Sequence, residues 1–208
     1  AGVGSIRILL PDALQKTVGN HLEVAEFAPS TPSGSFSQAA LAASLELGRW
    51  ADGVLIAGDL ARNSETAIWL EKFIVGYEGQ LTLAKDAIDY SGHVSATVLT
   101  RPVTLLVVTI AALQKLFIES NQTEPITFGM GLLNLVDALY RLTDKYKVSI
   151  IAKYASQFVV ASEGRVSTMP TDQAEEDFWR VKIAAHAAVW WLQNPKKSFE
   201  SLTAAVLQ

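Results

Sequence analysis

Short apolar runs alternate with longer segments of helical spacing along most of this chain, and this alternation constrains its fold more than any other feature. The runs are rich in Val, Ile and Leu and are bounded by residues typical of turns, as buried strands are. Strands that alternate with helices predict βαβ units, which build a mostly parallel sheet with helices on both faces. The predicted strands are residues 5–10, 53–56, 80–84, 96–99 and 148–153.

Helices are expected between and after these strands, and residues 64–77 give the clearest example. Their apolar positions recur at helical spacing, their charged residues lie elsewhere, and Asn63 is a suitable N-cap. The apolar face consists of Ala67, Leu70, Ile74 and Tyr77. The other predicted helices are residues 37–50, 103–119, 132–144, 171–193 and 198–207.

The pattern changes after residue 148, where extended runs follow one another and Ser162-Glu163-Gly164 reads as a turn. This predicts an antiparallel hairpin at one edge of the sheet. The expected fold class is therefore an α/β protein, a three-layer α/β/α sandwich whose sheet is mostly parallel. With 208 residues, the chain is expected to form one domain over residues 1–208.

Composition excludes several classes of protein. Hydrophobic residues make up 50% and charged residues 18% of the chain, which indicates a globular protein. A net charge of -4 without a clustered basic face argues against nucleic acid as a partner. The longest apolar stretch, 103–113, is too short to cross a membrane, and no signal peptide pattern is seen, so we expect a cytoplasmic protein. Without cysteine, disulfides and thiolate chemistry are excluded.

The stretch VLIAGDLARNSET reads as a strand, a tight turn and the start of a helix. Unpaired amides at a helix start attract anions, and Arg62 adds a positive charge, so this turn is a candidate phosphate site. Asp59 opposes that interpretation, because its carboxylate would compete for the same amides unless a divalent cation bridges it to the ligand. The alternative is an ordinary turn in which Asp59 caps the helix and Arg62 is solvated.

Further candidates follow other predicted strands. Ligands of open α/β sheets bind at the carboxyl ends of the strands. Lys85 with Asp86, Thr100 with Arg101, and Lys153 all occupy such positions. The alternatives are that Asp86 caps a short helix and that Lys153 is a solvated lysine. The three histidines are far apart and give no metal-ligand spacing, so no metal site is predicted.

Several segments, in order and at matching intervals, resemble the ribokinase-like superfamily, and within it the ADP- or ATP-dependent NAD(P)H-hydrate dehydratases, a family also described as carbohydrate kinases. The family's GPGLGR resembles residues 57–62, its DADAL resembles 84–88, and its LTPHPGE resembles 99–105. This resemblance implies a ribokinase-like fold, ADP or ATP with Mg2+ as cofactor, and an adenine nucleotide as partner. Together with the strand ends, it predicts nucleotide binding by Gly58, Asp59, Arg62, Asn63, Asp86, Thr100, Arg101 and Lys153.

The chain departs from that family at the catalytic turn. The family's GTGD turn, whose amides bind phosphate and whose Asp acts as a base, falls near residues 178–181, where this chain has Phe-Trp-Arg-Val. The nearest carboxylates, Glu175, Glu176 and Asp177, lack the glycines that let a backbone approach an anion. We therefore assign no catalytic residue. An N-terminal segment of the family is also expected to be missing, because the chain starts at AGVG.

Three functions remain open on the sequence. The first is an NAD(P)H-hydrate dehydratase-like or carbohydrate-kinase-like protein that binds nucleotide; if active, it would be a carbon-oxygen lyase or a small-molecule kinase. The second is a non-catalytic scaffold or assembly protein, with the Trp-bearing C-terminal helix as a contact in a homo-oligomer. The third is a small-molecule kinase whose acid comes from Glu175, Glu176 or Asp177.

Overall fold

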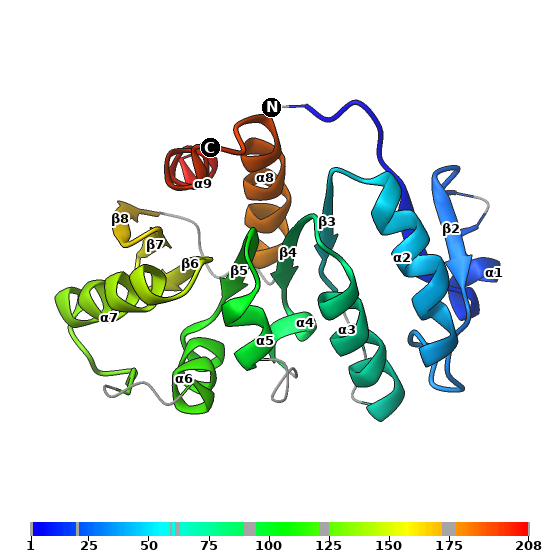
Figure 1. Cartoon of the computed structure of the whole chain (residues 1–208), viewed down its shortest axis with the longest axis horizontal. Coiled ribbons are helices and arrows are strands. Elements are labelled where there is room, and N and C mark those ends of the chain that lie inside the picture. The colour runs from blue at the N-terminus through cyan, green and yellow to red at the C-terminus, as the bar shows by residue number, and fades with distance from the viewer. Residues whose placement is uncertain are drawn as a thin grey trace. The chain divides into compact units, whose positions relative to one another are not determined.

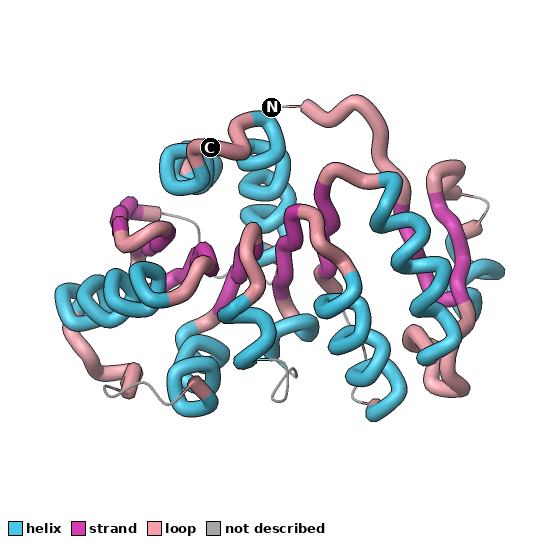
Figure 2. The backbone as a smooth tube through the Cα atoms, in the orientation of Figure 1, coloured by secondary structure: helices cyan, strands magenta, loops and turns pink. Residues whose placement is uncertain are grey.

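The computed structural model describes residues 2–19, 21–58, 60, 63–89, 95–120, 125–171 and 178–207. The chain divides into two compact units, each with its own β-sheet (Figure 2). Unit 1 is built mainly from residues 53–58 and 80–208, and unit 2 from residues 2–52 and 59–79. The single domain expected over residues 1–208 stays a prediction.

Unit 1 contains a six-stranded sheet in which the strands follow their order in the chain. The first four strands pair in parallel and the last two are antiparallel, which confirms the predicted mostly parallel sheet with a hairpin at one edge. Glu163 and Gly164 form the two-residue turn of that hairpin, and both have positive φ, as tight hairpin turns require. The strands are β3 (Gly53–Ile56), β4 (Gln80–Ala84), β5 (Thr104–Val108), β6 (Val148–Tyr154), β7 (Gln157–Ser162) and β8 (Arg165–Pro170).

Helices cover both faces of this sheet, as a three-layer sandwich requires (Figure 1). Helices α8 (Trp179–Gln193) and α9 (Ser198–Val206) lie on one face, and α7 (Leu132–Lys145) lies on the other. Alternate residues of the strands, such as Leu105 and Val107, pack into a core with Trp191 of α8. The Trp-bearing helix, which the sequence offered as a subunit contact, thus places Trp191 inside its own unit. No described helix is long and apolar enough to span a membrane.

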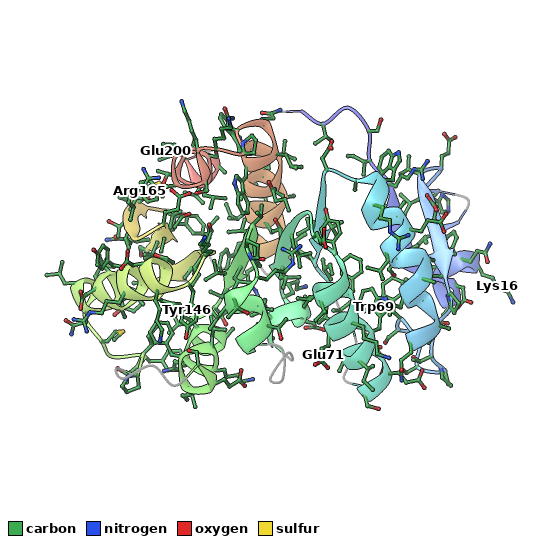
Figure 3. The ribbon with its side chains drawn as sticks, viewed as in Figure 1. Lys16, Trp69, Glu71, Tyr146, Arg165 and Glu200 are labelled. Atoms are coloured by element: carbon green, nitrogen blue, oxygen red, sulfur yellow. The ribbon has the colours of Figure 1, made fainter. Side chains whose placement is uncertain are left out.

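Unit 2 combines a two-stranded parallel sheet with two longer helices. Aromatic rings stack in its core in the order Phe36, Trp69, Phe73 and Tyr77; Trp69 and Phe73 lie one turn apart on α3, and Tyr77 is its C-cap. The indole of Trp69 (labelled in Figure 3) donates a hydrogen bond of 3.0 Å to Ser44. The elements are β1 (Ile8–Pro11), η1 (Asp12–Leu14), α1 (Gln15–Val18), β2 (Ala25–Ala28), η2 (Gln38–Ala40), α2 (Leu41–Trp50) and α3 (Ser64–Gly76).

Two sequence predictions are wrong around residue 100. The segment predicted as the strand 96–99 belongs to helix α5 (Ser95–Thr100). The strand comes later, as β5, inside the segment predicted as the helix 103–119. Thr109 then caps α6 (Ile110–Glu119) by accepting a hydrogen bond from the amide of Ala112, at 3.1 Å.

We expect the α7 side of the sandwich to carry much of the stability of unit 1. Leu139 of α7 is fully buried, so Leu139→Ala should lower the free energy of unfolding by about 2–5 kcal/mol through lost burial and the cavity left behind. Leu133 on the same helix is 81% exposed, so Leu133→Ala should change it by less than about 0.5 kcal/mol. Urea unfolding followed by circular dichroism measures both. Equal losses in the two variants would contradict this packing.

An ion-pair network joins the edge strand β8 to helix α9. Arg165 donates hydrogen bonds to Glu200 at 2.7 Å and to Glu163 at 3.0 Å, and Figure 3 shows Arg165 and Glu200 side by side. The hydrogen bond from Arg165 lowers the pKa of Glu200 below its usual value of 4.5. The same contact raises the pKa of Arg165.

These pKa directions predict a pH-dependent contribution to stability. A carboxyl group with a lowered pKa in the folded state stabilises the protein above its unfolded pKa and loses that effect as the pH falls through the folded pKa. The wild type should therefore exceed Glu200→Gln in stability at pH 7, and the difference should shrink as the pH falls below 4.5. Urea titrations between pH 7 and pH 3 test this, with Glu46→Gln on the exposed face of α2 as control. A difference that is constant with pH would contradict it.

Candidate functional site

Parallel pairing brings the carboxyl ends of four strands to one edge of the main sheet, here called the carboxyl edge. The pairs nearest this edge are Ile56 with Leu83, Ala84 with Val107, and Val108 with Ala152. Continued by two residues, the first register places Gly58 beside Lys85. Lys153 comes one residue after Ala152 on β6, which β5 separates from β4. The structure thus brings together three positions that the sequence singled out: Gly58, the Lys85-Asp86 pair and Lys153.

The backbone at this edge turns sharply as the strands end. Gly58 has a φ of 122°, a conformation that residues with a side chain rarely adopt, which explains the need for glycine after β3. Lys85 has a φ of 52°, and its carbonyl accepts hydrogen bonds from the amides of Ile88 and Asp89. These bonds start the short helix α4 (Asp86–Asp89), of which Asp86 is the first residue.

An ion pair connects α4 to the first turn of α8. Nη1 of Arg180 lies 2.8 Å from Oδ1 and 2.9 Å from Oδ2 of Asp89. The side chains are only 14% and 26% exposed, so the interaction is screened less than a surface pair. Nζ of Lys115, on α6, donates to the backbone carbonyl of Asp89 at 3.2 Å. Three elements therefore meet at Asp89.

Aromatic rings complete this region. Nζ of Lys85 lies 5.6 Å from the ring centroid of Phe178, within range of a cation–π interaction. The ring of Trp179 lies 5.7 Å from that of Phe158 on β7, which fixes the start of α8 against the sheet. We call Lys85, Asp89, Lys115, Phe178 and Arg180 the edge cluster. Within it, Arg180 and Lys115 both donate to Asp89, so two cationic side chains hold one anionic residue.

The edge cluster occupies the place where the resemblance expects the GTGD turn. Helix α8 begins at Trp179, and Phe178 before it makes no side-chain capping hydrogen bond. Residues 178–181 supply neither glycine nor a carboxylate. The alternative acids Glu175, Glu176 and Asp177 lie outside the described residues. Within the described part of this turn, the groups that the family mechanism needs are therefore absent.

Thr100 and Arg101 lie away from the carboxyl edge. Thr100 ends α5 and Arg101 follows it, and both precede β5, so they lie at the amino end of the strands. Arg101 is 8% exposed and donates hydrogen bonds to the carbonyl of Pro102 and to Oγ1 of Thr104, which ties it to the start of β5. Their predicted location at a carboxyl strand end is wrong, because the strand predicted before them is a helix.

The turn in VLIAGDLARNSET is described only in part. Asp59 and Arg62 lie outside the described residues. Asn63, in unit 2, is the N-cap of α3, and its side-chain oxygen accepts a hydrogen bond of 2.8 Å from the amide of Thr66. This confirms the predicted cap and gives Asn63 a structural task. Among the described residues, no group of three or more His, Asp and Glu side chains is placed to hold a metal ion.

The sequence did not single out Asp89 or Lys115, and it noted Arg180 only as part of a lost motif. Asp89 and Arg180 are 91 positions apart, and neither stands in a recognisable pattern. One signal existed: Arg180 falls where the resemblance places an anion-binding turn. A basic residue at such a place is a candidate anion ligand, even after the glycines have gone.

Comparisons with known proteins agree on the fold. No protein-family model matches the sequence, and no curated protein matches it. Solved structures do match, each at 15% sequence identity. A ribokinase-like superfamily protein from Enterococcus faecalis V583 matches with a TM-score of 0.68, over 96% of this chain and 65% of that chain. A hypothetical protein from Streptococcus mutans matches with a TM-score of 0.69, over 98% and 69%.

A third match is a hydroxyethylthiazole kinase protein from Pyrococcus horikoshii OT3, with a TM-score of 0.59 over 96% of this chain and 76% of that chain. The fold is ribokinase-like. This confirms the predicted three-layer α/β architecture, and the likeness to these structures is one of fold. The present chain spans about two thirds of the Enterococcus protein. The narrower resemblance to NAD(P)H-hydrate dehydratases stays a prediction.

Proposed function

We propose that this protein is a carbohydrate-kinase-like, nucleotide-binding member of the ribokinase-like fold, and that it binds ADP or ATP with Mg2+ at the carboxyl edge. The observation that carries the proposal is that Gly58, Lys85 and Lys153 all lie at the carboxyl edge, after β3, after β4 and near the end of β6. The carboxyl ends of strands are the usual ligand position in open α/β sheets. The kinase-like fold of a solved neighbour supports the same ligand class.

The chemistry of Gly58, Lys85 and Lys153 suits the phosphates of a nucleotide. Lys85 and Lys153 are both half-buried, so their charges act at short range with limited screening. Ammonium groups are common phosphate ligands. Gly58 has no side chain, and a Cβ built there would meet no atom of the described residues within 4 Å, its two chain neighbours aside, so a ligand can approach the backbone at this point. Mg2+ would enter with the nucleotide, bound mainly by its phosphates.

We further propose that the bound nucleotide is not used for the family's dehydration reaction. That reaction needs a base and an amide cradle at the start of α8, and the described turn offers Phe178, Trp179 and Arg180 instead. Losing a single anion-hole donor typically costs on the order of 100- to 1000-fold in rate. Loss of both donor groups and base would leave binding without turnover.

Nucleotide binding is tested by thermal unfolding with millimolar ADP or ATP and Mg2+. At a ligand concentration about tenfold above Kd, the native state gains ~1.4 kcal/mol, which corresponds to a rise in Tm of roughly 3–6 °C. Lys153→Gln should reduce this shift, because it removes a phosphate-binding charge. Lys147→Gln is the matched control, because Lys147 immediately precedes β6, at the opposite end of the same strand. An unchanged Tm in the wild type, or an equal reduction of the Tm shift in the two variants, would contradict the proposal.

The absence of dehydration is tested by incubating the protein with hydrated NADH or NADPH, ADP or ATP, and Mg2+ while following the nicotinamide absorbance. We expect no turnover above the rate without protein. Turnover that is lost in Glu175→Gln, Glu176→Gln or Asp177→Asn would instead support an enzyme with a rearranged catalytic acid. Phosphorylation of a small molecule that is lost in the same variants would support the kinase alternative.

Assembly into a homo-oligomer is the second candidate function. The tryptophans of α8 do not favour that helix as the subunit contact. Trp191 is 4% exposed, and Trp179 and Trp190 pack against the same core of unit 1. The exposed apolar residues Leu133 and Tyr140 of α7 offer another surface for a homo-oligomer. A protein that shows no nucleotide shift but a concentration-dependent mass in solution would support assembly.

A further inference from the structure

The ion pair between Arg180 and Asp89 uses the guanidinium group in an unusual way. Both contacts to the carboxylate come from one nitrogen, Nη1, at 2.8 and 2.9 Å. A guanidinium group is a planar fork that binds a carboxylate or phosphate best through two parallel N–H donors. Asp89 therefore occupies Arg180 without using the fork geometry that gives this group its strongest anion contacts.

The surroundings of this pair favour an anion with more charge than one carboxylate. Lys115 contacts the backbone of Asp89 at 3.2 Å, and Lys85 lies at the other end of the four-residue helix α4. Asp86, the other described carboxylate on α4, is half-buried at its first position. A phosphate group carries more charge and more acceptor oxygens than a carboxylate and would be the better partner for this set of donors.

We propose that the carboxylate of Asp89 occupies an anion site in the ligand-free protein, and that Arg180 releases this carboxylate and binds a phosphate group when ligand binds. This rests on the proposed nucleotide function, because the site lies at the same carboxyl edge. Arg180, in the first turn of α8, then takes over the task that glycine amides perform in the family. Asp89 moves out with its charge solvated, while Lys115 and Lys85 remain beside the ligand.

The exchange has a measurable consequence, because an internal competitor reduces the apparent affinity for the ligand. A binding-competent state that is only fractionally populated weakens the observed binding by that fraction. Neutralising the competitor should therefore strengthen binding. This direction is unusual, since most substitutions at a ligand site weaken it, and it separates the exchange from a purely structural ion pair.

The experiment is isothermal titration of the full chain with inorganic phosphate, ADP and adenosine. Asp89→Asn should bind inorganic phosphate and ADP about tenfold more tightly than the wild type, and Arg180→Gln should bind them about tenfold more weakly. Asp137→Asn is the matched control, because it removes a carboxylate that also pairs with an arginine, Arg141, but on the exposed face of α7, and it should change Kd by less than about threefold. Adenosine, which has no phosphate, should respond to none of these substitutions.

Folding of each variant is checked by circular dichroism, because removing one partner leaves a partly buried charge unpaired. The double variant Asp89→Asn, Arg180→Gln leaves no charge unpaired and should bind phosphate as weakly as Arg180→Gln. If Asp89→Asn fails to fold, Arg180→Lys is the variant that tests the exchange, because it keeps the positive charge but removes the planar pair of N–H donors. Weaker phosphate binding than the wild type would support the exchange. Unchanged phosphate binding would overturn it.

The results separate this inference from the proposed function. ADP binding that weakens in Lys153→Gln but is unchanged in Asp89→Asn and Arg180→Gln would overturn the exchange and leave nucleotide binding intact. Tighter phosphate binding by Asp89→Asn without any response to ADP would support an anion site and reject the nucleotide. No binding of phosphate or ADP by any variant, Asp89→Asn included, would overturn both.

Discussion

The parallel hydrogen-bond register of β3 to β6 is the constraint on which the site depends. These strands come from segments that are separated by helices and loops, yet their carboxyl ends finish in one row. Side chains cannot reach a common ligand unless that row is fixed. The register is fixed because β4 and β5 are buried on both faces, and a slip of one residue would exchange the two faces and break the packing against α4 and α8. The core of unit 1 thus positions the site as well as stabilising the sheet.

Sequence patterns predicted the parts of the fold that have both a periodic interior and a clear boundary. Residues 53–56 and 80–84 are short apolar runs next to glycine or charged residues, and they form β3 and β4. Asn63 marks the start of α3 because its side chain accepts the amide hydrogen bond that a helix start leaves unpaired. In these places, local chemistry and tertiary structure favour the same conformation.

Sequence patterns gave wrong secondary structure where a run of apolar residues showed neither helical nor strand periodicity. The run 96–99, Ala-Thr-Val-Leu, is short and mostly apolar, which fits a buried strand or a buried helix equally well, and it is part of α5. The apolar stretch 103–113 reads as one element but is two, and only Thr109, as a cap, marks the change from β5 to α6. Local sequence patterns also failed to predict the candidate site. Asp89 and Arg180 meet across 91 positions because sheet and helix packing bring them together, and no local pattern contains that information.

The ion pair between Arg180 and Asp89 also explains how this site differs physically from the anion-binding turn of the family that the sequence resembles. A glycine turn binds an anion with backbone amides, which cannot move away and carry only partial charge. The start of α8 instead presents Arg180, a full charge on a flexible side chain, and such a charge in a partly buried place must have a partner when no ligand is present. Asp89 is that partner. Once a side chain replaces the amides, an internal counter-ion is required for stability, and any ligand of this site has to compete with it.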